Sequence, residues 1–411
     1  MQLSSMTDRR VVLVSYYGHQ ARLFAPMAEA LSGHVKVKHL RVYPLTVERV
    51  AASVFCRDSL QLDLLDNITR YYRLKKTLEH PNLDTPRWRA HLWRRATQWY
   101  YLFRRKLAGA DLLVVWNGFS IPLGAAVAAA RSLGMKMLFC ENGVLPGTLA
   151  MDPQGINYAN SIAGKPGQFY QSIAVEPKEA KDLFEITPQQ RPLRKVAGHV
   201  STRCDDDKPL PDHYVLFAMQ VHDDTQVLLF SPRFPSIAAA VSYVWERVAA
   251  YNARTGDTLQ LVVKEHPSDF GRVDYSALRA SLPGSYFLRS TPVSKIIPDA
   301  EAVITLNSAV GVEGLLYLRP VITLGDAFYN VPGMVHHVGA QDDLAGVLAE
   351  TIGRPVNVEL ITKFLYFLRY DYLVSVSRHA RDVASFEPAV KRILQTLDDK
   401  LYWVPRSSNG C

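Results

Sequence analysis

Short apolar runs rich in β-branched residues alternate with longer helical stretches along most of the chain. The runs of the first half predict four strands, at 11–17, 35–42, 110–118 and 135–143. A helical pattern begins at residue 21 and ends at Gly33, and a second one covers 123–134. Strands that alternate with helices in this way are typical of a parallel sheet covered by helices.

The second half repeats this alternation after a polar interval. Residues 187–212 contain several prolines and show no hydrophobic periodicity, as linkers do. Further strands are predicted at 214–220, 259–267, 301–308 and 319–325, with helices at 236–256 and 311–319, and a helical, aromatic segment at 357–396. We therefore predict an α/β protein of two Rossmann-like domains, 1–200 and 201–356, which face a central cleft. The remaining segment, 357–411, is predicted to form helices that pack back across both domains.

Composition narrows the class of protein. The chain has 411 residues, of which 48% are hydrophobic, enough for two ordinary cores. Its apolar runs are shorter than the roughly 20 residues that cross a bilayer, and "MQLSSMTDRR" lacks the apolar core of a secretory signal. We expect a soluble, cytoplasmic protein. The ending "VPRSSNGC" is compatible with one module of a longer protein.

Charge and cysteine content leave several partners open. The net charge of +8 is compatible with nucleic acid, an anionic membrane surface or an acidic substrate. The four cysteines, Cys56, Cys140, Cys204 and Cys411, have no CxxC spacing, so neither a disulfide framework nor a zinc site is expected. The pattern calls for no metal and no cofactor.

Polar clusters follow three of the strands predicted in the second domain. They are Gln220 to Asp224 after the first strand, Lys264 to His266 after the next, and Asn307 with Ser308 after the third. Because ligands bind at the carboxyl ends of parallel strands, we expect these side chains to line one ligand site. Ser308 precedes a predicted helix, so its hydroxyl and the first backbone N–H groups can bind an anion. The alternative is an ordinary helix cap, and a structural role for His266.

The motifs "QVHDDTQ", "VKEHPSDFG" and "AVITLNSAVGVEGLLYLRPVITLGDAFYNVPGM" resemble those of bacterial capsule polysaccharide biosynthesis proteins, a family that includes retaining β-Kdo glycosyltransferases. The stretch "FCENGVLPGTLAMDPQGINYANS" in the first domain is similar to another motif of this family. The resemblance covers residues 135–165 and 214–335. It implies a GT-B-like fold in which the first domain binds the acceptor, the second binds CMP-Kdo, and His266 and Ser308 hold the CMP phosphate.

The resemblance also assigns two catalytic carboxylates. Asp224 matches the acidic position of the family's Gln-Val-x-x-Asp-x-Gln motif, whereas Asp223 does not. A retaining transferase that works by double displacement needs a carboxylate nucleophile, which the resemblance places at Asp224. Glu141 is then the general base for the acceptor. The alternatives are that Asp224 caps the following turn and that Glu141 is an exposed loop acid.

Five further residues complete the predicted donor site. They are Lys264, Asn307, Gln220, Gln226 and Glu313, which supply a cation, amides for the sugar and an acceptor for ribose hydroxyls. Gln220 and Gln226 equally fit a loop-holding role, and Glu313 fits a favourable interaction with the helix dipole. The acidic runs at 205–207 and 223–224 resemble metal-binding motifs of other transferases, but we interpret the first as a solvated linker.

The predicted activity is transfer of Kdo from CMP-Kdo to a glycan or glycolipid acceptor in capsule or lipopolysaccharide O-antigen biosynthesis. A CMP-sialic acid transferase and a non-catalytic glycan-binding or export subunit are the alternatives. Residues 87–106 place four apolar side chains, Trp88, Leu92, Trp99 and Phe103, along one helical face among arginines. Such a stripe fits contact with the anionic inner membrane from its cytoplasmic face, or docking onto the protein core. No nucleic-acid-binding module surrounds it, so no nucleic acid is expected.

Overall fold

The computed structural model describes residues 8–43, 60–186 and 204–404, except for residue 378. These residues form two compact units, which are residues 1–162 with 372–411 and residues 163–371. The unit boundaries therefore lie at other positions than the predicted domain ends at 200 and 356. Much of the predicted linker, residues 187–203, lies outside the described part of the chain, as do Cys56 and Cys411. Cys140 and Cys204 are free thiols.

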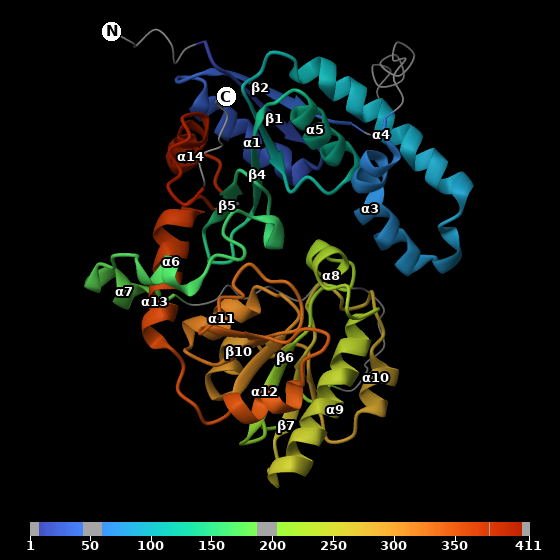
Figure 1. The fold of residues 1–411 in the computed structure, drawn as a ribbon, viewed down its shortest axis with the longest axis vertical. Coiled ribbons are helices and arrows are strands. Elements are labelled where there is room, and N and C mark those ends of the chain that lie inside the picture. Colours follow the sequence, from blue (N-terminus) through green and yellow to red (C-terminus); the bar gives the residue numbers. More distant parts are fainter. Residues whose placement is uncertain (1–7, 44–59, 187–203, 378, 405–411) are drawn as a thin grey trace. The chain divides into compact units, whose positions relative to one another are not determined.

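Unit 1 contains a six-stranded sheet in the order β12-β5-β4-β3-β1-β2, and Figure 1 labels its strands β1, β2, β4 and β5. Its strands are β1 (Arg10–Ser15), β2 (Lys36–Arg41), β3 (Leu112–Trp116), β4 (Lys136–Asn142), β5 (Leu149–Asp152) and β12 (Leu373–Val374). The first four strands pair in parallel, while β5 is antiparallel to both β4 and β12. Its main helices are α1 (Gly18–Leu31), α3 (Leu62–Glu79), α4 (Pro86–Leu107), α5 (Ile121–Ser132) and α14 (Glu387–Leu397). All the strands predicted for the first domain are present.

Unit 2 contains a fully parallel sheet in the order β11-β10-β9-β6-β7-β8. Its strands are β6 (Tyr214–Ala218), β7 (Gln260–Lys264), β8 (Tyr286–Leu288), β9 (Ala302–Thr305), β10 (Val321–Thr323) and β11 (Val335–His337). Counted from β6, this is the Rossmann order 3-2-1-4-5-6. Every residue of β6 and β9 is buried, as expected for strands covered on both faces.

Unit 2 also contains α-helices along its described residues. They are α6 (Gly167–Gln171), α7 (Pro177–Leu183), α8 (Thr225–Phe230), α9 (Ile237–Thr255), α10 (Ser276–Ser281), α11 (Val310–Leu316), α12 (Leu344–Thr351) and α13 (Val358–Tyr366). Local sequence fixes the ends of α9, the longest of them. The Ser236 hydroxyl accepts from the N–H of Ala239, and Gly256 ends the helix at a left-handed φ of 73°. The predicted fold class, α/β with two Rossmann-like units, is confirmed. The predicted cleft between the domains stays a prediction.

The C-terminal segment differs from the continuous helical region that we predicted at 357–396. Leu373 and Val374 form β12, which pairs with Leu149 and Ala150 of β5. The segment is also divided between the units, because α13 belongs to unit 2 and α14 to unit 1. Its apolar side chains serve two cores, so their spacing in the sequence gives no single period.

Candidate functional site

The predicted donor residues lie at one edge of the unit 2 sheet. In an open α/β sheet, the ligand site lies at the carboxyl ends of the two strands where the order reverses, here β6 and β9. Gln220 and Asp224 follow β6, whereas Asn307 and Ser308 follow β9. His266 follows β7, the next strand. The topology therefore brings the three predicted clusters to the same edge of the sheet.

A pair of buried amides joins the turns after β6 and β9. Gln220 Nε2 donates to Asn307 Oδ1 at 2.9 Å, and the Asn307 N–H donates to Gln220 Oε1 at 3.1 Å. Asn307 Nδ2 lies 2.9 Å from Ser231 Oγ and 3.0 Å from the carbonyl oxygen of Gln226. These bonds use the polar atoms of Gln220 and Asn307 within the protein. We therefore interpret both residues as holding the loop, the alternative role that Gln220 had from sequence.

The two adjacent aspartates have different surroundings. Asp223 is 5% exposed, and its Oδ2 lies 2.7 Å from the Arg272 guanidinium. Asp224 is half-buried and is the N-cap of α8, where its Oδ1 accepts from the N–H of Gln226 at 2.8 Å. The capping role that sequence left open for Asp224 is therefore present. A cap of this kind fixes one carboxylate oxygen and so orients the other.

Asp269 holds the turns after β6 and β7 together. It is 2% exposed, and its two oxygens accept from the N–H and from Nδ1 of His222, each at 2.9 Å. The Tyr275 hydroxyl donates to Asp269 Oδ2 at 3.3 Å, and Arg272 lies 3.5 Å from Oδ1. Arg272 therefore contacts both Asp269 and Asp223. Neither Arg272 nor Asp269 was selected from sequence, because each contacts the 222–223 turn across more than 45 residues.

His266 is oriented by its own turn. Its Nδ1 accepts from the N–H of Ser268 at 3.1 Å, which in the neutral ring places the proton on Nε2. The half-buried side chain thus presents Nε2–H as a hydrogen-bond donor at the strand end. An anionic oxygen accepts a hydrogen bond from such a donor.

Ser308 lies at the beginning of α11, as predicted, and is 8% exposed. Its hydroxyl accepts from the N–H of Val310, the first residue of α11, at 3.2 Å, whereas the N-cap of the helix is Ala309. Gly311, in the first turn of α11, packs against a tyrosine side chain. A Cβ at Gly311 would lie 2.4 Å from the Tyr329 hydroxyl, which donates to the carbonyl of Ser308. The glycine therefore makes room for a buried tyrosine.

Lys264 is a buried cation beneath the same edge. It is 6% exposed, and its ammonium donates to the carbonyl oxygens of Glu265 and Arg289 at 2.8 and 2.9 Å. Burial lowers the pKa of Lys264 to about 8. Glu265, 4% exposed, accepts from Arg279 and Arg289, both at 3.0 Å. This geometry favours a role for Lys264 in joining β7 to β8.

Two other predicted donor residues lie close to this edge. Gln226 is in the first turn of α8, and Glu313 is half-buried in the first turn of α11. Their assignment to the sugar and the ribose stays a prediction.

The acidic run at 205–207 is not the solvated linker that we expected. Asp206 accepts from the N–H groups of Ser290 and Thr291, both at 2.9 Å, and from the Thr291 hydroxyl at 2.7 Å. Burial opposes ionisation of Asp206, but these hydrogen bonds outweigh it and lower its pKa. Asp205 pairs in the same way with the backbone of Phe287. Over the described residues, no group of three or more His, Cys, Asp or Glu side chains is placed to hold a metal ion.

Glu141, the predicted general base, lies in unit 1 near the carboxyl end of β4. Its Oε2 accepts from Asn117 Nδ2 at 3.3 Å, and its Oε1 accepts from the N–H of Asn142 at 2.9 Å. Asn117 follows β3 and has a left-handed φ of 38°, next to Gly118 at 82°. The Asn-Gly pair is a sequence signal for such a turn.

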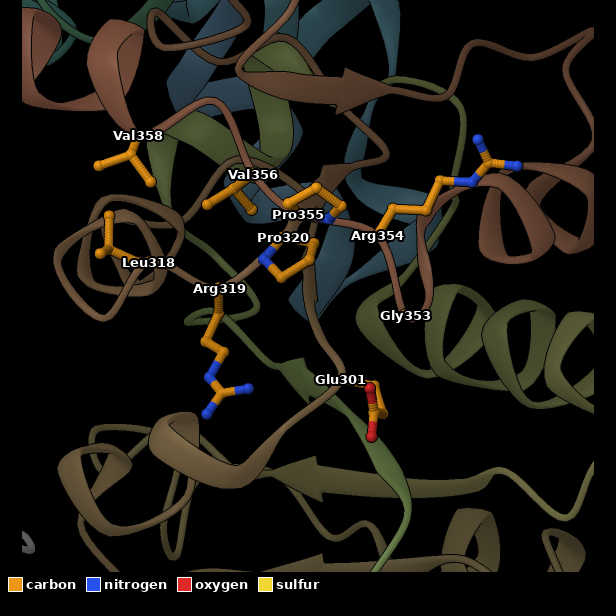
Figure 2. A pocket seen from close by; sticks show the side chains of 9 residues that line it. All are labelled: Glu301, Leu318, Arg319, Pro320, Gly353, Arg354, Pro355, Val356 and Val358. Atoms are coloured by element: carbon orange, nitrogen blue, oxygen red, sulfur yellow. The ribbon is translucent and has the colours of Figure 1, made fainter.

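Figure 2 shows a pocket of about 370 Å³ in unit 2. Glu301, Arg319 and Arg354 are among its lining side chains, together with prolines and valines. Glu301 precedes β9 and Arg319 precedes β10, so the pocket lies at the amino ends of the strands. It is therefore at the opposite edge of the sheet from Asp224 and Ser308.

The basic aromatic helix α4 packs on the core of unit 1. Leu92, Trp99 and Phe103 are at most 2% exposed, and Trp88 is half-buried against the same cluster. The apolar stripe is therefore not on the surface, and the interpretation as a membrane-inserting face is wrong. None of the described helices is both long enough and apolar enough to span a bilayer.

The order of the unit 2 sheet and the polar residues at its carboxyl edge define a Rossmann-type ligand-binding unit. This unit overlaps a family match: residues 192–345 match the model of the family described as capsule polysaccharide biosynthesis protein. This match agrees with the family that the sequence motifs resemble.

Relatives of the chain match only parts of their own length. The chain is 34% identical over 266 residues to protein FixF of Sinorhizobium fredii, covering 65% of this chain and 61% of that protein. It is 25% identical over 163 residues to the capsule polysaccharide export protein KpsS of Escherichia coli, covering 38% of each. Among solved structures, the β-Kdo 2,7-transferase of Thermosulfurimonas dismutans KpsC is 15% identical, with a TM-score of 0.46 and coverage of 94% and 99%. A TM-score this low supports no conclusion about function.

Proposed function

We propose that the chain is a retaining β-Kdo glycosyltransferase that uses CMP-Kdo as donor and a glycan or glycolipid as acceptor, in capsule or lipopolysaccharide O-antigen biosynthesis. One observation carries the proposal. His266, Ser308 and Asp224 occur in the motif order of the family and lie at one edge of a Rossmann-ordered sheet. The family match over residues 192–345 supports the link to polysaccharide biosynthesis.

In the proposed reaction, unit 2 binds the donor. His266 Nε2–H and the first turn of α11 donate hydrogen bonds to the CMP phosphate, and the helix dipole adds to the attraction. A carboxylate oxygen of Asp224 attacks the anomeric carbon of Kdo while the bond to the phosphate oxygen breaks, and CMP leaves with that electron pair. The hydrogen bond from the Gln226 N–H to one Asp224 oxygen holds the carboxylate at the start of α8.

The second displacement releases the enzyme. An acceptor hydroxyl attacks the anomeric carbon, its proton passes to Glu141, and the bond to Asp224 breaks to restore the carboxylate. Two inversions at one carbon give net retention. The proposal requires neither metal nor cofactor, because donor hydrogen bonds and the helix dipole compensate the phosphate charge.

A second candidate function has its own support. One relative is named as an export protein, so a non-catalytic glycan-binding subunit with the same fold is the main rival. Donor cleavage separates the candidates. We expect the purified protein to release CMP from CMP-Kdo and not from CMP-sialic acid, and to do so in the presence of a chelator. Cleavage of CMP-sialic acid alone would identify the sialic acid alternative, and cleavage of neither donor would favour the non-catalytic one. Loss of activity on chelation would contradict the metal-free mechanism.

The proposal includes a peripheral contact with the cytoplasmic face of an anionic inner membrane. Because the apolar stripe of α4 is buried, only charge can carry this contact. Arg87, Arg94, Arg104 and Arg105 are exposed on α4. Basic side chains near an anionic surface contribute about 1 kcal/mol each at low salt.

A further inference from the structure

Aromatic side chains gather at the carboxyl edge of the unit 1 sheet. The order β2-β1-β3-β4 places the reversal between β1 and β3, and right-handed crossovers then put α1 and α5 on opposite faces. Tyr16, Tyr17 and His19 follow β1, while Trp116 ends β3 and Phe119 follows it. This edge of unit 1 therefore has the position of a ligand site and is lined by rings.

The rings near β1 have a defined arrangement. Tyr17 and His19 lie parallel within 8°, with centroids 5.9 Å apart, and the His19 ring meets Trp116 edge-on at 5.8 Å. Tyr16 contacts Tyr17 at 4.6 Å. The backbone beneath them is held by Gln20, whose Oε1 accepts from the N–H groups of Tyr16 and Tyr17 at 2.8 and 3.1 Å. The ring faces are thus positioned before any ligand binds.

Exposure distinguishes this cluster from ordinary core packing. Tyr17 is 51% exposed and His19 is also exposed, whereas Trp116 beneath them is 5% exposed. Exposing an aromatic surface to water is unfavourable and adds nothing to the packing of the core. An exposed ring on a rigid, buried support therefore indicates a binding role, which a buried ring does not. Such a surface fits a ligand with a flat apolar face.

Polar side chains follow the ring cluster directly in the sequence. Asn117 follows Trp116 directly, and its amide bonds to Glu141. A pyranose combines a face of C–H groups, which stacks on the electron-rich face of an aromatic ring, with a rim of hydroxyls. Amide and carboxylate side chains next to aromatic rings are the groups that such a rim requires.

We infer that Tyr17 and His19 form a subsite that binds a pyranose ring by stacking. That this sugar belongs to the acceptor rests on the proposed function, because Glu141 is the base assigned to the acceptor hydroxyl. The subsite itself depends only on the ring geometry. A matched control is available in Tyr402, which is 61% exposed and lies in the same unit, beyond α14.

The test uses saturation-transfer NMR on the full chain with three probes, the methyl β-glycosides of glucose, galactose and N-acetylglucosamine. At least one probe should receive saturation, mainly on the C–H protons of one ring face. Tyr17→Ala should weaken its binding about two- to tenfold, as expected for the loss of one stacked ring. Tyr17→Phe should restore wild-type affinity, which excludes misfolding, and Tyr402→Ala should have no effect.

Two results would overturn the subsite. One is the absence of saturation for all three probes, and the other is equal affinity of Tyr17→Ala and the wild type. CMP release from CMP-Kdo by the wild type, measured on the same preparation, distinguishes the two proposals. Sugar binding that depends on Tyr17 without CMP release supports the subsite and rejects the transferase. CMP release without such binding supports the transferase and rejects the subsite.

Discussion

Single residues at the strand ends divide into those that we propose to bind the donor and those that hold the turns. His266 and Ser308 lie where the hydrophobic pattern predicts, since a strand end and a helix start are local features. The long-range partners of the buried amides and of Asp223 could not be predicted. Gln220 meets Asn307 87 residues away, and Asp223 meets Arg272 49 residues away. Such pairings depend on strand order, which one sequence does not contain.

Phosphate binding gives a prediction at this scale. His266→Ala and Ser308→Ala should each weaken CMP binding by roughly 1.5 to 3 kcal/mol, because each removes a group that orients or donates hydrogen bonds to a charged phosphate. Titration calorimetry measures this loss. His336→Ala, an exposed histidine on β11, is the matched control and should bind CMP normally. Unchanged affinity in both site variants would reject the site assignment.

Among the elements, α4 shows what hydrophobic periodicity can and cannot predict. An apolar stripe bordered by arginines predicts an amphipathic helix correctly, but it does not say what the stripe faces. In the structure the stripe packs in the core with α3 and α5. The strand β12 could not be predicted either, because two residues give no period and their pairing partner, β5, lies more than 200 residues away.

At the scale of elements, we predict that the charges of α4 attach the protein to an anionic membrane surface. The protein should cosediment with anionic vesicles at low salt and be released at high salt, since ions screen surface charges. Arg94→Gln with Arg105→Gln should reduce binding by up to about 2 kcal/mol. The control neutralises two other exposed charges, Arg354 and Lys391, and should bind as the wild type does. Binding that survives high salt would show that apolar groups insert, contrary to the burial of the stripe.

At the scale of the whole molecule, the two α/β units follow from the sequence but their limits do not. Hydrophobic alternation occurs twice, so two sheets are predictable. The chain, however, returns to unit 1 after residue 371. Phe386, which precedes α14, and Ile393 and Leu397 on α14 lie in the core of that unit. Composition along the chain gives no sign of this return.

Deletion of residues 372–411 tests this division. Each buried aliphatic or aromatic side chain contributes about 1.5 to 3 kcal/mol, so the loss of those three alone approaches the whole stability of a typical domain. Hydrogen exchange should become faster in peptides from α1 and β4, while peptides from β6, β7 and β9 keep their protection. Unchanged exchange in α1 and β4 would show that unit 1 does not need its C-terminal part.

The central claim is a covalent bond between Asp224 and Kdo, and intact-protein mass spectrometry without acceptor tests it most directly. After mixing with CMP-Kdo, the wild type should gain the mass of one Kdo residue, mapped to the peptide 220–226. Asp224→Asn should gain none, and its fold should persist because asparagine also caps helices. Asp223→Asn should still form the adduct. An adduct on Asp223 or Glu141, turnover by Asp224→Asn, or a product of inverted anomeric configuration would contradict the account.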